Sequence, residues 1–142
     1  ANSTIRAMQF HPEAFEDIKS LILIQPMNGK TFVERTCENL GIDVESGVKE
    51  YGDINTEKTG LNYDDHYIRP FIKNVKIPTL MLLVRNDMSS RESDIQAMYD
   101  DLEVEKDIIW VEDTPWRFHG YTYFSEHPEA MLNWFDKYMV NV

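Results

Sequence analysis

The chain has 142 residues, of which 42% are hydrophobic and 12% are aromatic, and its formal net charge is −11. This composition supplies enough apolar side chains for the core of about one domain. The negative charge argues against nucleic-acid binding, which is built on clustered Lys and Arg, and the spread of the acids along the chain favours solubility.

Two further features bound the environment of the protein. No apolar run approaches the ~18 residues of a membrane span, and the chain does not begin with a basic-then-apolar signal peptide. The single cysteine, Cys37, excludes an internal disulfide and a multi-cysteine metal site. We therefore expect a cytoplasmic protein that has no membrane partner, no metal and no cofactor. Because the chain opens at Ala1 rather than at methionine, we expect it to be a processed or excised piece of a longer protein.

The first 41 residues predict a helix, a strand and a second helix. Residues 1–10 have helical spacing and stop before a His-Pro pair. Residues 20–25 are an apolar run typical of a strand that is buried on both faces. Residues 28–40 predict a helix, closed by a left-handed cap at Gly41. Its expected core face comprises Phe32, Val33, Thr36, Cys37 and Leu40, so Cys37 is interpreted as a core residue and not as a nucleophile.

The middle of the chain is the least regular part. Residues 43–62 carry three glycines and many charges. They are compatible with a loop containing a short helix near residues 44–51, with a cap over a cleft, or with disorder. Helical spacing resumes in residues 63–73, where Pro70 either begins the regular part of the helix or kinks it.

A second buried strand is predicted at residues 79–84, between Pro78 and a polar turn that ends at Asp87. Ser89-Ser90-Arg91-Glu92 has the pattern of a capping box, in which a serine oxygen and a glutamate satisfy free amides at the start of a helix. The expected core face of that helix comprises Ile95, Met98, Tyr99 and Leu102.

Residues 107–111 predict a third strand, and residues 112–124 a loop that carries His119 and Gly120. Ser125 is expected to cap the last helix, whose inward face comprises Met131, Trp134, Phe135, Tyr138 and Met139. Strands that alternate with helices imply right-handed crossovers and a parallel sheet. The predicted fold is one α/β domain spanning residues 1–142, with three layers and a mainly parallel sheet of about three strands flanked by helices.

Asp87 and His119 are the candidate catalytic residues. Because all strands of a parallel sheet end at one edge, the residues that follow the second and third strands share that edge. An aspartate that accepts a hydrogen bond from an imidazole fixes its tautomer, and the histidine can then act as general base and acid. The other histidines, His11, His66 and His127, are interpreted as surface residues.

The order of these features resembles the C-terminal half of the α/β-hydrolase superfamily, in its dienelactone-hydrolase-like or esterase-like branch. The strand followed by an acid turn, the histidine loop, and the helix after a nucleophile elbow all have counterparts, and the resemblance covers nearly the whole chain. The matching stretches are Ala1-Asn2-Ser3-Thr4, His11-Pro12-Glu13-Ala14-Phe15, Leu23-Ile24-Gln25-Pro26, Ile77-Pro78-Thr79-Leu80, Arg85-Asn86-Asp87, Arg117-Phe118-His119-Gly120-Tyr121 and Pro128-Glu129.

This resemblance implies an ester or related acyl bond as the substrate, with Asp87 and His119 as two members of a nucleophile-His-Asp triad. The nucleophile elbow, G-x-S-x-G or its cysteine variant, is absent, and Ser3 falls inside the helix that follows it. We therefore expect the chain to be inactive alone. Residues 21–25 would form an exposed sheet edge, which implies self-association or pairing with the missing N-terminal half.

Two other functions stay open on the residues alone. The chain could be a non-catalytic α/β interaction module in which Asp87 and His119 are incidental. A flavodoxin-like or receiver-like domain would need an acidic cluster or a phosphate loop at the strand ends, and neither is found in the sequence. The aromatic residues of the His119 region could line an apolar pocket or belong to the core: Trp116, Phe118, Tyr121 and Tyr123.

Overall fold

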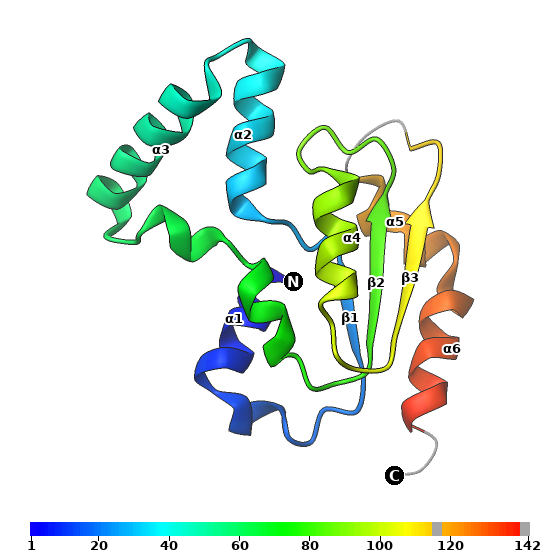
Figure 1. The fold of residues 1–142 in the computed structure, drawn as a ribbon. Helices are drawn as coiled ribbons and strands as arrows, with labels where there is room; N and C mark the ends of the chain where they lie inside the picture. The colour runs from blue at the N-terminus through cyan, green and yellow to red at the C-terminus, as the bar shows by residue number, and fades with distance from the viewer. Residues whose placement is uncertain (115–117, 140–142) are drawn as a thin grey trace.

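Helices cover both faces of a three-stranded parallel sheet in the computed structural model, which describes residues 1–114 and 118–139 (Figure 1). The strands β1 (Leu21–Ile24), β2 (Thr79–Val84) and β3 (Lys106–Val111) lie side by side in chain order. Leu21 of β1 and Lys106 of β3 both pair with Thr79, so the strands run in register from a common start. The predicted α/β class and parallel sheet are confirmed.

The central strand β2 is an unbroken apolar run because both of its faces are covered. All six of its residues are buried. Met81 and Leu83 belong to the core on one face of the sheet, and Leu80, Leu82 and Val84 belong to the core on the other. A strand with a solvated face would instead alternate apolar and polar residues.

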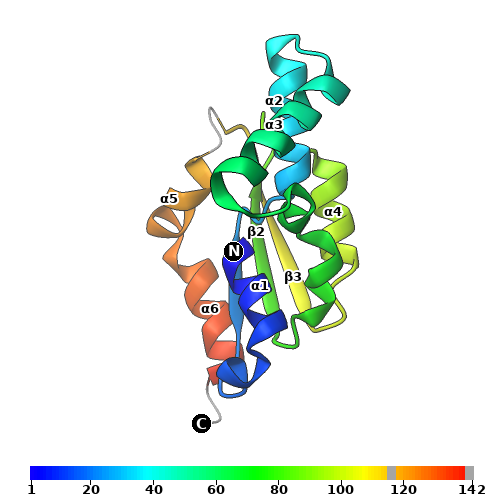
Figure 2. The ribbon, with the colours of Figure 1, turned by 90° about the vertical axis from the view of Figure 1, so that its left-hand side faces the viewer.

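Two helical layers enclose this sheet (Figure 2). On one side lie α1 (Asn2–Phe10), α4 (Glu92–Asp100) and the 3-10 helix η3 (Arg69–Asn74). On the other side lie α5 (His119–Glu126) and α6 (Pro128–Met139). A short 3-10 helix, η1 (Pro12–Phe15), connects α1 to β1.

The helices α2 (Gly29–Leu40) and α3 (Val44–Thr59) form a hairpin that projects beyond the carboxyl edge of the sheet (Figure 1). The turn between them begins at Gly41, whose φ of 67° gives the predicted left-handed cap. The prediction for the face of α2 was only partly right. Val33 and Cys37 are buried, whereas Phe32 is 39% exposed and Leu40 is 68% exposed. Because the hairpin stands away from the sheet, α2 is covered mainly where it faces α3 and the following 3-10 helix, and at Thr31, which contacts α4.

The expectation of an irregular segment at residues 43–62 was wrong, because α3 spans 16 of these residues. Asp43 caps the helix by accepting a hydrogen bond from the Ser46 amide at 2.9 Å, and Gly60 ends it with a φ of 70°. No residue of α3 is buried. Its apolar residues Val44 and Val48 pack against the core of the hairpin but are only partly buried, so the apolar stripe is short and the caps were the clearer signal.

Residues 63–73 form two 3-10 helices in place of the expected α-helix. These are η2 (Tyr63–His66) and η3, which begins beside Pro70. Of the two roles considered for Pro70, starting a helical segment is the one observed. Its ring fixes φ and removes an amide donor, which the first turn of a helix tolerates.

Four expectations about the helices after β2 were also wrong. Helix α4 has no side-chain cap, because Glu92 instead binds Arg85 at 2.6 Å and approaches the Asn86 amide at 3.4 Å. The predicted loop at residues 112–124 contains the start of α5. Ser125 lies inside α5, and its hydroxyl donates to the Thr122 carbonyl at 2.6 Å, so it does not cap α6. Met139 is 57% exposed and does not face the core.

Candidate functional site

Each of the three strands is followed by a residue with a left-handed backbone. Gln25 has a φ of 44°, Asn86 has a φ of 57° and Asp113 has a φ of 51°. Positive φ is uncommon for residues other than glycine and costs conformational energy. All three residues stand at the carboxyl edge of the sheet, where parallel α/β sheets bind ligands. The backbone strain of the described residues is therefore concentrated at this edge.

Asp87 directly follows Asn86, the strained residue after β2, and its carboxylate accepts a hydrogen bond from the Ser89 amide at 2.8 Å. It is half-buried and lines a small cavity together with Gln25, Ser90 and Trp110. The candidate acid thus stands at the predicted edge, held by the loop that precedes α4.

His119 is the first residue of α5, beyond the end of β3. Its Nε2 is 3.5 Å from a carboxylate oxygen of Glu126, and its Nδ1 is buried without a hydrogen-bond partner among the described residues. The structure therefore places Asp87 and His119 at one edge of the sheet. In the arrangement observed for the described residues, the ring of His119 contacts Glu126 and is not hydrogen-bonded to Asp87.

Gln25 is the site residue that the sequence analysis missed. It is 6% exposed, and neither its amide nitrogen nor its amide oxygen has a hydrogen-bond partner among the described residues. Its amide lies against Gly120, the residue after His119: a Cβ on Gly120 would stand 2.7 Å from the Gln25 oxygen. The signal in the sequence was a single amide directly after an apolar strand, which periodicity alone does not single out.

The loops that carry Asp87 and His119 are tied together by Arg85. Its guanidinium binds Glu92 at 2.6 Å and Glu112 at 3.2 Å, and it lies 4.1 Å from the ring centre of Trp110. The hydrogen bond to Glu92 raises the pKa of Arg85, so its charge is fixed. Its carbonyl accepts a hydrogen bond from the Thr114 hydroxyl at 3.0 Å, which links the end of β2 to the segment after β3.

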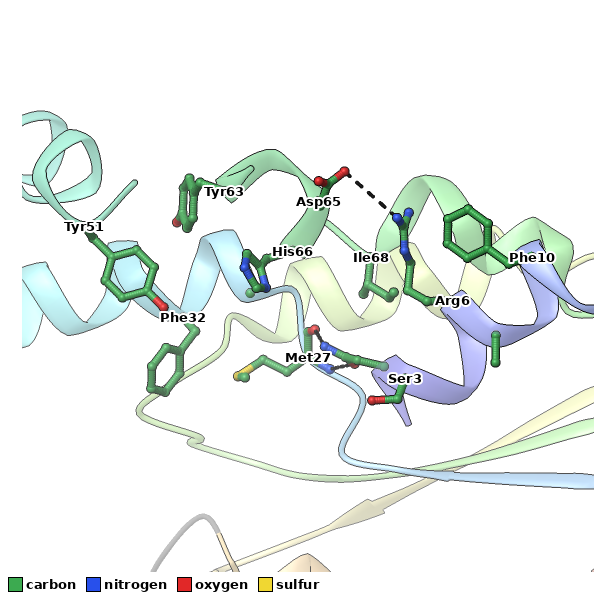
Figure 3. Close-up of a pocket in the computed structure, with 13 residues that line it drawn as sticks. Ser3, Arg6, Phe10, Met27, Phe32, Tyr51, Tyr63, Asp65, His66 and Ile68 are labelled. Carbon is green, nitrogen blue, oxygen red and sulfur yellow. Dashed lines mark hydrogen bonds and ion pairs between the residues drawn. The ribbon is translucent and has the colours of Figure 1, made fainter. Parts of the chain in front are cut away.

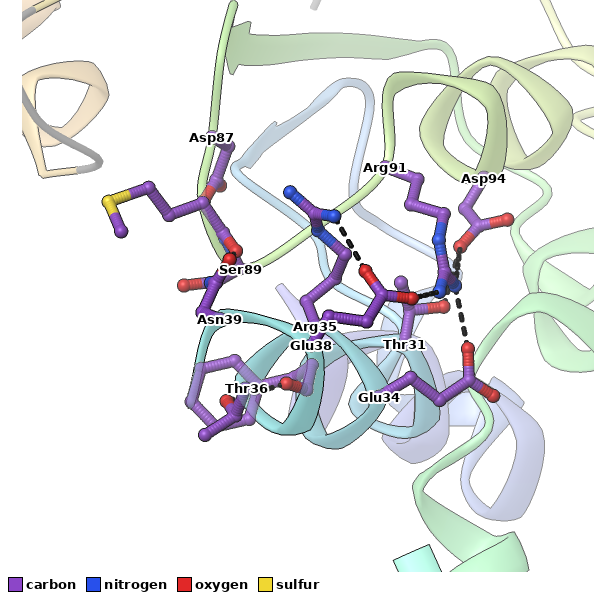
Figure 4. A network of polar contacts seen from close by, with 12 residues as sticks. Thr31, Glu34, Arg35, Thr36, Glu38, Asn39, Asp87, Ser89, Arg91 and Asp94 are labelled. Atoms are coloured by element: carbon purple, nitrogen blue, oxygen red, sulfur yellow. Dashed lines mark hydrogen bonds and ion pairs between the residues drawn. The ribbon is translucent and has the colours of Figure 1, made fainter. Parts of the chain in front are cut away.

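A second set of charges fastens α2 to the start of α4 (Figure 4). Arg91 binds Glu34 and Glu38 of α2, each at 2.6 Å. The Thr31 hydroxyl donates to the Asp94 carboxylate at 2.5 Å. Hydrogen bonds from Arg35 and Arg91 hold the pKa of Glu38 below its usual range. These contacts fix the direction in which the α2–α3 hairpin leaves the sheet.

A cavity of about 590 Å³ lies between α1, the start of α2, α3 and η2 (Figure 3). Tyr51 and Tyr63 meet edge to face at 5.5 Å, and the Tyr63 hydroxyl donates to the Lys30 carbonyl at 3.1 Å. Burial raises the pKa of Tyr63, which stays protonated. Arg6 adds a positive charge to the wall and lies 3.9 Å from Asp65. The volume suits a small organic molecule.

Of the aromatic residues near His119, Tyr123 has one of the two expected places, whereas Phe118 and Tyr121 are in neither. Phe118 and Tyr121 stack at 5.9 Å and are each about half exposed, at 49% and 52%. Tyr123 is partly buried and packs against the core beneath α5 and α6. None of these three lines the cavity of Figure 3. Trp116 and Arg117 lie outside the described residues.

Residues 1–114 and 118–139 contain no group of three or more His, Cys, Asp or Glu side chains arranged to hold a metal ion. In the same residues, no helix is both long enough and apolar enough to cross a membrane. Fold and site together define the chain as an α/β protein with polar, strained residues at the carboxyl edge of a parallel sheet. No family model matches the chain, and a search of curated proteins finds no match either.

Proposed function

We propose that residues 1–142 form the C-terminal part of an α/β-hydrolase domain that acts on an ester or related acyl bond, with Asp87 as the orienting acid and His119 as the general base. One observation carries the proposal. Asp87 and His119 follow neighbouring parallel strands and stand at the same edge of the sheet, with strand order equal to chain order.

Acyl transfer by this pair would give Asp87 and His119 each a defined role. The carboxylate of Asp87 accepts a hydrogen bond from the Nδ1–H of His119, directly or through another group, and so leaves Nε2 free to take a proton from the nucleophile. In the structure Nε2 faces the half-exposed carboxylate of Glu126. The ring therefore has to turn away from Glu126 for catalysis, while its buried Nδ1 gains a partner.

The nucleophile is proposed to lie outside residues 1–142, because the sequence contains no G-x-S-x-G or G-x-C-x-G. The environment of β1 supports a further strand beside it. The Leu21 amide donates to the Pro78 carbonyl just before β2 at 2.9 Å, and the Gln25 amide donates to Leu82 of β2 at 2.7 Å. The amides of Ile22 and Ile24 therefore point to the open edge. Two hydrogen bonds between the Asn2 side chain and the Met27 backbone hold the start of α1 at the same edge as Asp87.

The test is hydrolysis of p-nitrophenyl butyrate. The 142-residue chain alone is expected to leave the ester at the background rate. In a longer protein that also carries the elbow segment, Asp87→Asn and His119→Gln are each expected to lower kcat by roughly 10³–10⁴-fold. The matched variants are Asp113→Asn, at the same sheet edge, and His127→Gln, between α5 and α6, and both are expected to retain activity. An unchanged kcat in His119→Gln would contradict the proposal.

The contact between His119 and Glu126 favours a second candidate, a non-catalytic α/β interaction module in which Asp87 and His119 have no joint role. The same assay separates the two. The module predicts no hydrolysis above background in the longer protein and the same partner binding in wild type, Asp87→Asn and His119→Gln.

A further inference from the structure

The side-chain amide of Gln25 is a buried polar group at the carboxyl edge of the sheet. Its nitrogen and oxygen both lack a partner among the described residues, although the residue is only 6% exposed. A buried amide without hydrogen bonds costs free energy, so each such group calls for an explanation. The backbone of Gln25 is also held at a φ of 44°, while its amide still donates to the Leu82 carbonyl at 2.7 Å. Strain and an unpaired amide thus coincide at one residue.

The position of Gln25 relates it to both candidate catalytic residues. On one side it lines the same small cavity as Asp87. On the other, its amide rests on Gly120, and a Cβ there would lie 2.7 Å from the amide oxygen and 2.9 Å from the amide carbon. Gly120 follows His119, whose Nδ1 is likewise buried and without a partner among the described residues. The glycine allows the amide to reach the first turn of α5.

We propose that Gln25 is a positioning residue that bridges Asp87 and His119. Its Nε2–H donates to the carboxylate of Asp87, and its Oε1 accepts from the Nδ1–H of His119. The bridge forms by side-chain rotation at the carboxyl edge, with the His119 ring turned from Glu126. It fixes the tautomer whose Nε2 is unprotonated and carries the influence of the acid to a histidine that it does not contact directly.

One arrangement then satisfies three buried atoms at this edge that lack partners among the described residues: both polar atoms of the Gln25 amide and Nδ1 of His119. Asp87 keeps its hydrogen bond from the Ser89 amide, because a carboxylate has about four lone-pair sites. The observed position of the amide also explains why residue 120 is glycine, since a side chain there would displace it.

The inference rests on the proposed pairing of Asp87 with His119, but its test needs no substrate. The first measurement is the ring ¹⁵N chemical shifts of His119 in ¹⁵N-histidine-labelled protein at a pH where the ring is neutral, assigned by comparison with His119→Gln among the four histidines. The wild type is expected to have the proton on Nδ1. In Gln25→Met the proton is expected to move largely to Nε2, whereas Gln25→Glu, which keeps an acceptor, retains the Nδ1–H tautomer.

The second measurement is the midpoint of thermal unfolding. Met has the length of Gln and no polar amide, so Gln25→Met raises the midpoint if the amide is unpaired and lowers it, by about 3–8 °C, if the amide bridges two groups. Gln96→Met is the control, because Gln96 is exposed on α4 and its amide nitrogen donates to the Asp100 carboxylate at 2.9 Å.

The outcomes separate clearly. A changed tautomer with a lowered midpoint in Gln25→Met supports the bridge. Unchanged ring shifts in Gln25→Met overturn it, whether the midpoint falls, stays or rises. If the ring shifts respond to Gln25→Met but the longer protein hydrolyses no ester, the bridge stands and the hydrolase proposal fails. If the longer protein hydrolyses the ester with dependence on His119 but the ring shifts do not respond to Gln25→Met, the hydrolase proposal stands and the bridge fails.

Discussion

The sulfur of Cys37 in α2 packs directly on the backbone of Gly47 in α3, where a Cβ would stand only 2.5 Å from it. Cys37 is buried at this contact, although α3 buries no residue of its own. The hairpin therefore depends on the close approach of the two helices. The lone cysteine is a packing residue here, as its place in the sequence predicted.

We expect Gly47→Ala to destabilise the hairpin. The added methyl group would cost about 1–3 kcal/mol of overpacking, against a gain of about 0.5–1 kcal/mol in helix propensity. Gly52→Ala is the matched control, because its Cβ would lie 3.5 Å from Tyr63, in ordinary contact, and it should be stabilising. Hydrogen exchange of the α3 amides measures the stability of the hairpin in both variants. Equal protection in the two variants would contradict the close packing of Cys37 on Gly47.

Loss of the Arg91 guanidinium should loosen α2 without disturbing the sheet. Arg91→Met removes the contacts to Glu34 and Glu38. Because each half-exposed ion pair contributes at most about 1 kcal/mol, α2 amides should exchange about 2–5-fold faster. Arg69→Met, which removes a 2.6 Å pair with Asp101 away from the hairpin, should leave α2 exchange as it is. Faster exchange in β2 as well would show a global effect and not a local one.

The same contacts predict a pH dependence. Hydrogen bonds from Arg35 and Arg91 lower the pKa of Glu38, so their stabilisation is present above the unfolded pKa, about 4.5, and is lost as pH falls through the lower folded pKa. A carboxyl ¹³C titration of Glu38 should therefore have its midpoint below that of a free glutamate, and Arg91→Met should move it upward. Lys137 likewise lowers the pKa of Glu105, whose titration should not respond to Arg91→Met.

The open edge of β1 should associate with another strand. We expect concentration-dependent self-association in sedimentation equilibrium, through the amides of Ile22 and Ile24. Ile22→Pro removes one outward donor but none of the hydrogen bonds to β2, so it should give a monomer that retains its circular dichroism. Leu23→Pro, on the inward side, should unfold the sheet. Association that persists in Ile22→Pro would place the interface elsewhere.

The sequence by itself determined the parts whose burial is continuous. The apolar runs located β1, β2 and β3 to within about one residue at each end, because a strand covered on both faces needs an unbroken apolar stretch. The alternation of helices with these strands indicated a parallel sheet. Gly41 was assigned correctly because few other residues adopt a φ of 67°.

The tertiary structure alone decided what depends on partners distant in the chain. The helix α3 has only a short, partly buried apolar stripe. Glu92 pairs with Arg85 seven residues earlier in place of capping its own helix. At the site, sequence order placed Asp87 and His119 at one edge, but only the packed structure set Gln25 on Gly120 and turned His119 toward Glu126. Side-chain hydrogen bonds across strands depend on which residues the fold brings within about 3 Å, and no local pattern encodes that distance.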